Sequence, residues 1–326
     1  MTERLPERQA SHRGTLDAAH AVSMILKKTP LLPVEIGGVS CHVKAENLQP
    51  IGAFKIRGAW WRLSNLTPSE NAGGVVAVSS GNHAQGIAWA AKRLGISATI
   101  VMPRNAPHVK LDGTRALGAE VVLYERGPKD QGGEDRDEVA ARLIEERGGT
   151  LVHAFGDPWV IEGQGSLGVE LTQQIEGGPS RVIVCCGGGG LAAGIALACP
   201  DAAVHLVEPE GWDMVGQAIA AGKIVQAASD APETICDALQ PTATKPINLE
   251  LLKGRAEPGL TVRDEEVRSA QRWAFANLQM VLEPGGAAAL AAALAGKVKL
   301  DEHSVIVLTG GNADPVAFAQ TIAASA

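Results

Sequence analysis

The sequence predicts an α/β protein in which helices cover both faces of mainly parallel sheets. Short apolar runs rich in β-branched residues alternate with amphipathic segments, first over residues 75–153 and again over residues 181–308. The apolar runs are nearly continuous, which is typical of parallel strands buried on both faces. The chain has 326 residues, which is long enough for two compact units of this kind.

The first 70 residues predict few regular elements. Residues 1–15 are polar, and we expect that end to be frayed. A helix is expected over residues 15–27. Two prolines make residues 29–34 an extended segment, and a short strand is expected at 40–44.

A first α/β unit is predicted from residue 75 onward. Its strands are expected at 75–79, 98–102, 120–123 and 151–153, and its helices at 84–94, 109–117 and 134–146. We therefore assign residues 74–150 to a small domain on the substrate side.

The same alternation returns after residue 180. Strands are expected at 181–186, 203–207 and 304–308, and helices at 191–197, 264–278 and 287–294. Scattered Pro, Ala and Thr predict a loop-rich stretch over 222–258. Residues 1–73 and 151–326 are assigned to a large domain into which the small one is inserted.

Composition excludes several classes of function. The net charge is −7 and no Lys/Arg cluster stands out, which argues against nucleic acid as a partner. No apolar run reaches the roughly 20 residues of a membrane span, and the polar N-terminus does not resemble a secretion signal. Five cysteines fit neither a zinc site nor a disulfide framework. We expect a cytoplasmic protein.

A lysine in an unusual setting is the first candidate for chemistry. Lys55 lies between Phe54 and Ile56 in a turn flanked by glycines. It is either a surface residue at a helix start or an amine in a low-dielectric pocket, where burial lowers the pKa as a Schiff-base lysine requires. By itself the turn favours the surface interpretation.

Two strand-to-helix turns predict anion binding. Ser79, Ser80, Gly81, Asn82 and His83 open a predicted helix, where free backbone N–H groups can bind an anion. An ordinary N-cap explains one of these polar residues but not the block. The second turn holds four consecutive glycines before another helix, which indicates a phosphate site more than a flexible connection: Gly187, Gly188, Gly189, Gly190 and then Leu191.

A third strand ends in a hydroxyl. Thr309 follows residues 304–308 and precedes Gly310 and Gly311, at the sheet edge where open α/β sheets bind ligands. This signal is weak alone. Together, the apolar lysine turn, the phosphate loop, the anion loop and the terminal hydroxyl indicate pyridoxal 5'-phosphate as the cofactor.

In this order the motifs resemble the fold-type II pyridoxal-phosphate enzymes of the threonine/serine dehydratase and serine racemase family, from Pro30 almost to the C-terminus. The resemblance implies two three-layer α/β units like those of the tryptophan synthase β-subunit. It also implies a role for each motif residue. Lys55 would form the Schiff base, Phe54 would pack on the ring, Asn82 would contact the ring's 3-oxygen, Gly187, Gly188, Gly189, Gly190 and Leu191 would hold the phosphate, and Thr309 would face the pyridine nitrogen.

The resemblance implies substrate contacts as well. Ser79, Ser80, Asn82 and His83 would surround the substrate carboxylate, and Ser80 matches the second acid/base of the racemases, beside Lys55 as the first. Phe155 stands where the racemases carry an asparagine, which favours a dehydratase with a less polar side-chain pocket. Glu208 aligns with the first carboxylate of the racemases' divalent-cation site, but Met214 falls where the second is expected. Because hard cations prefer oxygen ligands, we assign no metal ligand and interpret the segment as a solvated acidic loop.

The function implied is an L-threonine or L-serine dehydratase (ammonia-lyase), which eliminates water from a 3-hydroxy amino acid and yields a 2-oxo acid and ammonia. Dehydration of 3-hydroxyaspartate or another 3-hydroxy amino acid, racemisation, and β-replacement remain open alternatives. A different class is also open: a non-catalytic α/β protein that binds a phosphorylated metabolite. We expect a homodimer acting on a small amino-acid substrate.

Overall fold

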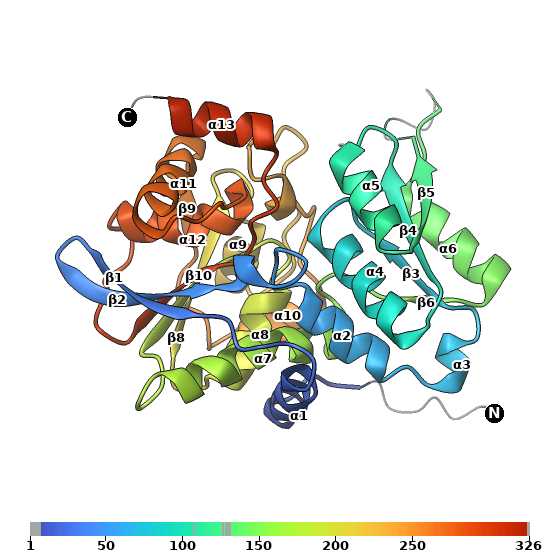
Figure 1. Ribbon diagram of the computed structural model, residues 1–326, viewed down its shortest axis with the longest axis horizontal. Coiled ribbons are helices and arrows are strands. Elements are labelled where there is room, and N and C mark those ends of the chain that lie inside the picture. Colours follow the sequence, from blue (N-terminus) through green and yellow to red (C-terminus); the bar gives the residue numbers. More distant parts are fainter. Residues whose placement is uncertain (1–7, 107, 126, 128–131, 325–326) are drawn as a thin grey trace.

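Two sheets organise the computed structural model, which describes residues 8–106, 108–125, 127 and 132–324 (Figure 1). The larger sheet has six strands, and all its neighbouring pairs are parallel except β1 with β2. Its spatial order is β1 (Leu31–Ile36), β2 (Val39–Ala45), β10 (Ser304–Leu308), β7 (Arg181–Cys185), β8 (Ala203–Pro209) and β9 (Leu260–Val262).

The smaller sheet has four parallel strands, in the order β5 (Glu120–Tyr124), β4 (Ala98–Pro103), β3 (Val75–Val78) and β6 (Thr150–Leu151). Successive residues of β3 point to opposite faces. Val75 and Ala77 pack in a core with α4 (Asn82–Leu94), whereas Val76 packs with α6 (Arg136–Arg147). Helix α5 (His108–Ala116) completes this unit.

The larger sheet is covered in the same way. Val182 and Val184 of β7 pack with α7 (Pro158–Gln174) and α8 (Gly190–Ala198), while Ile183 packs with α11 (Asp264–Leu278) and α12 (Pro284–Leu294). Both faces of β7 are covered by helices, so Val182, Ile183 and Val184 are all apolar. The remaining helices are α1 (His12–Ser23), α2 (Ile56–Ser64), α3 (Pro68–Asn71), α9 (Met214–Ala221), α10 (Pro246–Leu252), α13 (Pro315–Ala323) and two 3-10 turns, η1 (Glu46–Leu48) and η3 (Asp237–Leu239).

Helix α2 joins the two units, because it packs against α4 on one side and α7 on the other (Figure 1). Its contact with α7 is made by glycines. A Cβ atom on Gly163 would lie 2.6 Å from Cα of Gly58, closer than real atoms approach, so only glycines allow the two backbones to come this near. This contact fixes the start of α2, where Lys55 lies.

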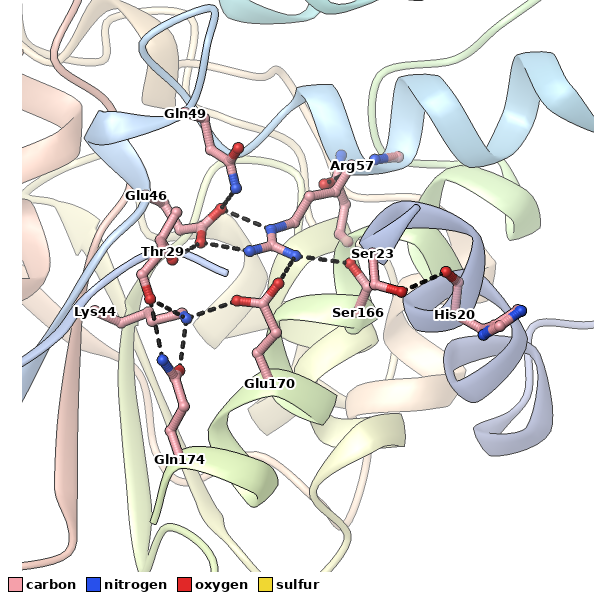
Figure 2. A network of polar contacts seen from close by, with 12 residues as sticks. His20, Ser23, Thr29, Lys44, Glu46, Gln49, Arg57, Ser166, Glu170 and Gln174 are labelled. Carbon is pink, nitrogen blue, oxygen red and sulfur yellow. Dashed lines mark hydrogen bonds and ion pairs between the residues drawn. The ribbon is translucent and has the colours of Figure 1, made fainter. Parts of the chain in front are cut away.

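Behind α2 lies a buried network of charges, which we call the Arg57 network (Figure 2). Arg57 donates to Glu46 and to Glu170, each at 2.7 Å, and Lys44 donates to Glu170 at 2.7 Å. The side chains of Arg57, Lys44 and Glu46 are fully buried. Burial opposes the charge on Arg57, but the two carboxylates outweigh it and raise the pKa of the guanidinium. The network ties β2 and η1 to α2 and α7.

The predicted α/β class with mainly parallel sheets is confirmed. Residues 31–34 of the expected extended segment belong to β1, which pairs with β2 as an antiparallel hairpin. The loop-rich stretch over 222–258 also contains η3 and α10. Glu162 lies inside α7, where its buried carboxylate accepts hydrogen bonds from Arg8 and Trp61.

The proposed domain boundaries stay a prediction. The first, between residues 73 and 74, precedes β3, and the second, between 150 and 151, falls within β6. No helix among the described residues combines the length and apolar character needed to cross a membrane.

Candidate active site

A cavity of about 640 Å³ lies where β3, β7 and β10 end. Every residue that the sequence nominated for the site lines this cavity: Phe54 and Lys55 before α2, Ser79 to His83 after β3, Phe155, the loop from Gly187 to Leu191 after β7, and Thr309 after β10. Segments from the whole length of the chain therefore meet at the carboxyl ends of parallel strands, where α/β sheets bind ligands.

Lys55 directly precedes α2 and presents its amine to the cavity. Its Nζ donates to the carbonyl oxygen of Ala154 at 3.0 Å and lies 5.0 Å from the centre of the Phe54 ring. No carboxylate pairs with it within the described part of the chain. Burial therefore lowers the pKa of Lys55 to about 8, so the neutral, nucleophilic fraction of the amine near neutral pH is small but far larger than for an unshifted lysine.

The glycine loop connects β7 to α8 and has no side chains to fill the space before the helix. Gly189 adopts φ +93°, a left-handed conformation that favours glycine. Thr244 and Asn248 both donate to the carbonyl oxygen of Gly188, at 2.9 and 2.8 Å, and fix the loop from outside. The first N–H groups of α8 have no partner within the helix, so the loop can bind a phosphate there.

The loop after β3 is similar but carries side chains. Gly81 N–H donates to the Ser79 hydroxyl at 3.2 Å, and Ser80 lines the cavity with no hydrogen-bonding partner among the described residues. His83 is buried, and its Nε2 lies 2.9 Å from the carbonyl oxygen of Val152. Burial lowers the pKa of His83 to about 3, so this histidine is neutral. It can offer a substrate carboxylate a dipole but not a charge.

A buried carboxyl group stands beside Asn82. Glu283 precedes α12, is 6% exposed, and accepts a hydrogen bond from Asn82 at 2.5 Å. Asn312 in turn donates to Asn82 at 2.8 Å. The Glu283 carboxyl and the Asn312 amide together fix the orientation of the Asn82 amide. Burial raises the pKa of Glu283 to about 7, although the bond from Asn82 opposes this shift.

Sequence reasoning missed other residues of the site. Thr244 and Asn248 belong to the stretch interpreted as loop, and no local motif marks them. The ring of His153 accepts from the N–H groups of Phe155 and Gly156 through Nδ1, which shapes the turn that presents Phe155. Phe155 in turn packs on Gly188 and Gly190, where a Cβ atom would collide with it. The signal available was the pair of glycines facing an aromatic residue across the fold.

These residues fit pyridoxal phosphate. The cavity offers an amine with no acidic partner among the described residues, a phosphate-sized loop at a helix start, and the Thr309 hydroxyl at its buried end. By contrast, the Glu208 segment does not fit a divalent cation. Both Glu208 oxygens accept backbone N–H groups of α9, from Val215 at 3.0 Å and Gly216 at 2.9 Å, and Met214 offers only a thioether. No group of three or more metal-binding side chains is present among the described residues.

Comparison with known proteins places this geometry in context. The family model described as pyridoxal-phosphate dependent enzyme matches residues 22–310. The chain is 37% identical over 307 residues to a serine racemase from Schizosaccharomyces pombe (91% of this chain, 92% of the relative). It is 36% identical over 323 residues to an L-threo-3-hydroxyaspartate ammonia-lyase from Pseudomonas sp. (96% and 98%). The crystal structure of a threonine deaminase from T.th. superposes with a TM-score of 0.84 at 38% identity, covering 93% of this chain and 99% of that one.

Proposed function

Because the chain belongs to the family of pyridoxal-phosphate dependent enzymes, we propose that it is an ammonia-lyase that removes water from L-threonine or L-serine. The products are a 2-oxo acid and ammonia. The observation that carries the proposal is the setting of Lys55, whose amine has a lowered pKa and shares one cavity with the glycine loop and Thr309.

Each residue of the site has its own role in this reaction. Bound pyridoxal phosphate supplies an electron sink that makes the substrate's Cα proton acidic. The neutral amine of Lys55 is the base that accepts this proton, and Ala154 O orients it. The glycine loop and the start of α8 hold the phosphate, Phe54 packs on the ring and Asn82 contacts the ring's 3-oxygen. Ser79, Ser80 and the neutral His83 position the substrate carboxylate.

Thr309 favours elimination over transamination. A hydroxyl would not stabilise a charged pyridine nitrogen as a carboxylate does, so the bound cofactor would be a weaker electron sink, which favours β-elimination over transamination. Phe155 gives the substrate side chain an apolar wall.

The test is a release assay for 2-oxo acid and ammonia on a panel of 3-hydroxy amino acids of both configurations. Turnover of L-threonine or L-serine supports the proposal, and inversion at Cα without elimination overturns it. A purified protein without a borohydride-sensitive yellow chromophore would place the chain among non-catalytic phosphometabolite-binding proteins.

A second candidate substrate is 3-hydroxyaspartate, and one observation favours it. Besides Lys55, three basic side chains line the cavity, from Lys110, Arg136 and Lys245. Lys110 is paired with Asp237, whereas Lys245 has no ion-pair partner within the described residues. Arg136 is only loosely paired, with Asp137 at 4.0 Å. Arg136 and Lys245 can therefore attract a second carboxylate. Arg136→Ala and Lys245→Ala should raise KM for 3-hydroxyaspartate about tenfold and leave KM for L-threonine unchanged if this substrate is the natural one.

Racemisation is the further alternative within the family. It requires Ser80 to exchange a proton on the substrate face opposite Lys55, and Ser80→Ala separates the two activities because elimination needs only Lys55 as the base. We also propose a cytoplasmic homodimer, which sedimentation of the purified protein and fractionation of cells would test.

A further inference from the structure

We propose that Cys185 is a positioning residue that sets the direction of the Thr309 hydroxyl hydrogen, so that Thr309 donates a hydrogen bond to the cofactor's pyridine nitrogen and that nitrogen carries no proton. The inference rests on the proposed function, in which Thr309 faces this nitrogen. It goes further, because it assigns a role to a cysteine that neither the motifs nor the reaction required.

The contact comes from the register of two neighbouring strands. Ile306 of β10 lies opposite Ile183 of β7, so the two strands end beside each other, and Cys185 and Thr309 meet at the bottom of the cavity. The distance between Cys185 Sγ and Thr309 Oγ1 is 3.0 Å. Both residues are buried, at 6% and 3% exposure.

The backbone of Thr309 is already fixed. Its carbonyl oxygen accepts the N–H of Phe54 at 3.1 Å, and Ala53 forms a bridge with Gly310. Within the described residues, the Thr309 hydroxyl has Cys185 as its hydrogen-bonding partner. The remaining freedom is therefore the hydroxyl hydrogen, which points either to sulfur or into the cavity.

Two arguments favour the cavity. A thiol has one hydrogen to donate, and its sulfur is a weak acceptor, so the S–H donates to Oγ1 and leaves the hydroxyl hydrogen for a better acceptor. Burial raises the pKa of the Cys185 thiol to about 11, which keeps that hydrogen in place. An unprotonated pyridine nitrogen is the matching acceptor.

The experiment uses the holoenzyme reconstituted with pyridoxal phosphate labelled with nitrogen-15 in the ring. The ring-nitrogen chemical shift reports protonation and hydrogen bonding directly. We expect wild type and Cys185→Ser to show an unprotonated, hydrogen-bonded nitrogen, because a serine hydroxyl donates from the same place. Cys185→Val and Cys185→Ala should move the shift toward that of a nitrogen without this hydrogen bond.

Kinetics supply a second readout. The lost orientation is equivalent to one hydrogen bond of about 0.5–1.5 kcal/mol, so kcat should fall about 2- to 10-fold in Cys185→Val with KM unchanged, and recover in Cys185→Ser. Cys199→Ala is the matched control, since this buried thiol donates to Gly168 O in the α7–α8 contact and lies outside the cavity. It should leave the nitrogen shift unchanged.

The outcomes separate this inference from the proposed function. A wild-type protein that binds no labelled cofactor overturns both. A holoenzyme whose nitrogen shift is the same in wild type, Cys185→Val and Cys185→Ala overturns the role of Cys185 alone. A protonated ring nitrogen in the wild-type holoenzyme would also overturn the role of Cys185.

Discussion

Two groups of buried ionisable side chains lie on either side of α2, and they differ in one respect. In the Arg57 network each charge is paired, so Arg57 keeps its charge. Burial disfavours the charge of Glu46, but Arg57 outweighs this effect and lowers the pKa of the Glu46 carboxyl. In the cavity, Lys55 and His83 have no opposite charge beside them within the described residues. Their pKa values fall to about 8 and about 3 because burial, the largest cause for each, is not offset by a carboxylate.

The difference shows which buried ions hold the structure together and which carry out chemistry. A paired ion keeps one protonation state at all ordinary pH values and cannot exchange protons. An unpaired group whose pKa lies close to the working pH, as that of Lys55 does, can exchange protons. Burial lowers the pKa of both Lys44 and Lys55, but in Lys44 the charges of Glu170 and Glu46 oppose this shift, whereas Lys55 meets only a backbone carbonyl.

The largest effect is expected on the cavity side. Lys55→Ala removes the base and the amine that bonds to the cofactor, so elimination should fall by about 10³-fold or more while the fold is retained. The release assay and borohydride reduction of the chromophore measure this. Lys44→Met is the matched change in the network and should lower stability while the folded fraction keeps its chromophore. Retention of the reducible chromophore by Lys55→Ala would contradict the assignment.

Breaking the network should have the reverse consequence. Arg57→Met leaves Glu46 with a buried, unmatched charge and leaves Glu170 with Lys44 alone, so the free energy of unfolding should drop by about 3–5 kcal/mol. Denaturant unfolding followed by circular dichroism measures it. Adding Glu46→Gln to Arg57→Met should recover part of the loss, because it removes the unmatched charge. Equal stability of wild type and Arg57→Met would mean that the network is dispensable.

The glycine loop offers a smaller change. Gly188→Ala places a methyl group against the Phe155 ring, and the resulting overpacking should cost about 1–3 kcal/mol, seen as weaker cofactor binding. Fluorescence titration of the apoprotein with pyridoxal phosphate measures the affinity. Gly113→Ala, a helix position in α5 with only an ordinary contact to Gln85, is the control and should bind the cofactor like wild type.

Glu283 predicts a pH dependence of opposite sign to that of the network. Its pKa is about 7 in the folded protein and near 4.5 when unfolded, so the folded state binds more protons between these values. Stability of the apoprotein should therefore fall as pH rises from 4.5 to 7, by up to about 1.4 kcal/mol per pH unit from this group. Glu283→Gln should flatten that slope in urea unfolding curves. An unchanged slope would refute the assignment.

For the addition or removal of a divalent cation we expect no effect on activity. Because Glu208 caps α9 and Met214 lacks an oxygen ligand, neither magnesium nor a chelator should change the rate of elimination. The release assay with both additions checks this. A several-fold loss of activity in chelator, restored by magnesium, would show that the α9 cap opens to admit a cation.

Much of the fold was predictable from local sequence, and so were the motif residues that line the cavity. Buried strands such as β3 and helices such as α11 have clear patterns of apolar residues, and four consecutive glycines mark the phosphate loop in the sequence. Helix α7 was not predictable in this way. It is buried nearly all round and carries three glycines, so neither an amphipathic period nor helix propensity marks it in the sequence. The pairing of Glu283 with Asn82, 201 residues apart, depends on tertiary structure alone.

The glycine contact between α2 and α7 has a consequence for anyone who engineers this chain. Replacing a helix glycine with alanine is a standard route to a more heat-resistant protein, since it restricts the unfolded chain. At Gly58 and Gly163 the same replacement would act as a wedge, since the two backbones meet there without a gap. It would push the first turn of α2 away from α7 and move the reactive amine with it. Substitutions meant to raise the thermal stability of this protein should therefore be placed elsewhere, on the exposed turns of the small sheet.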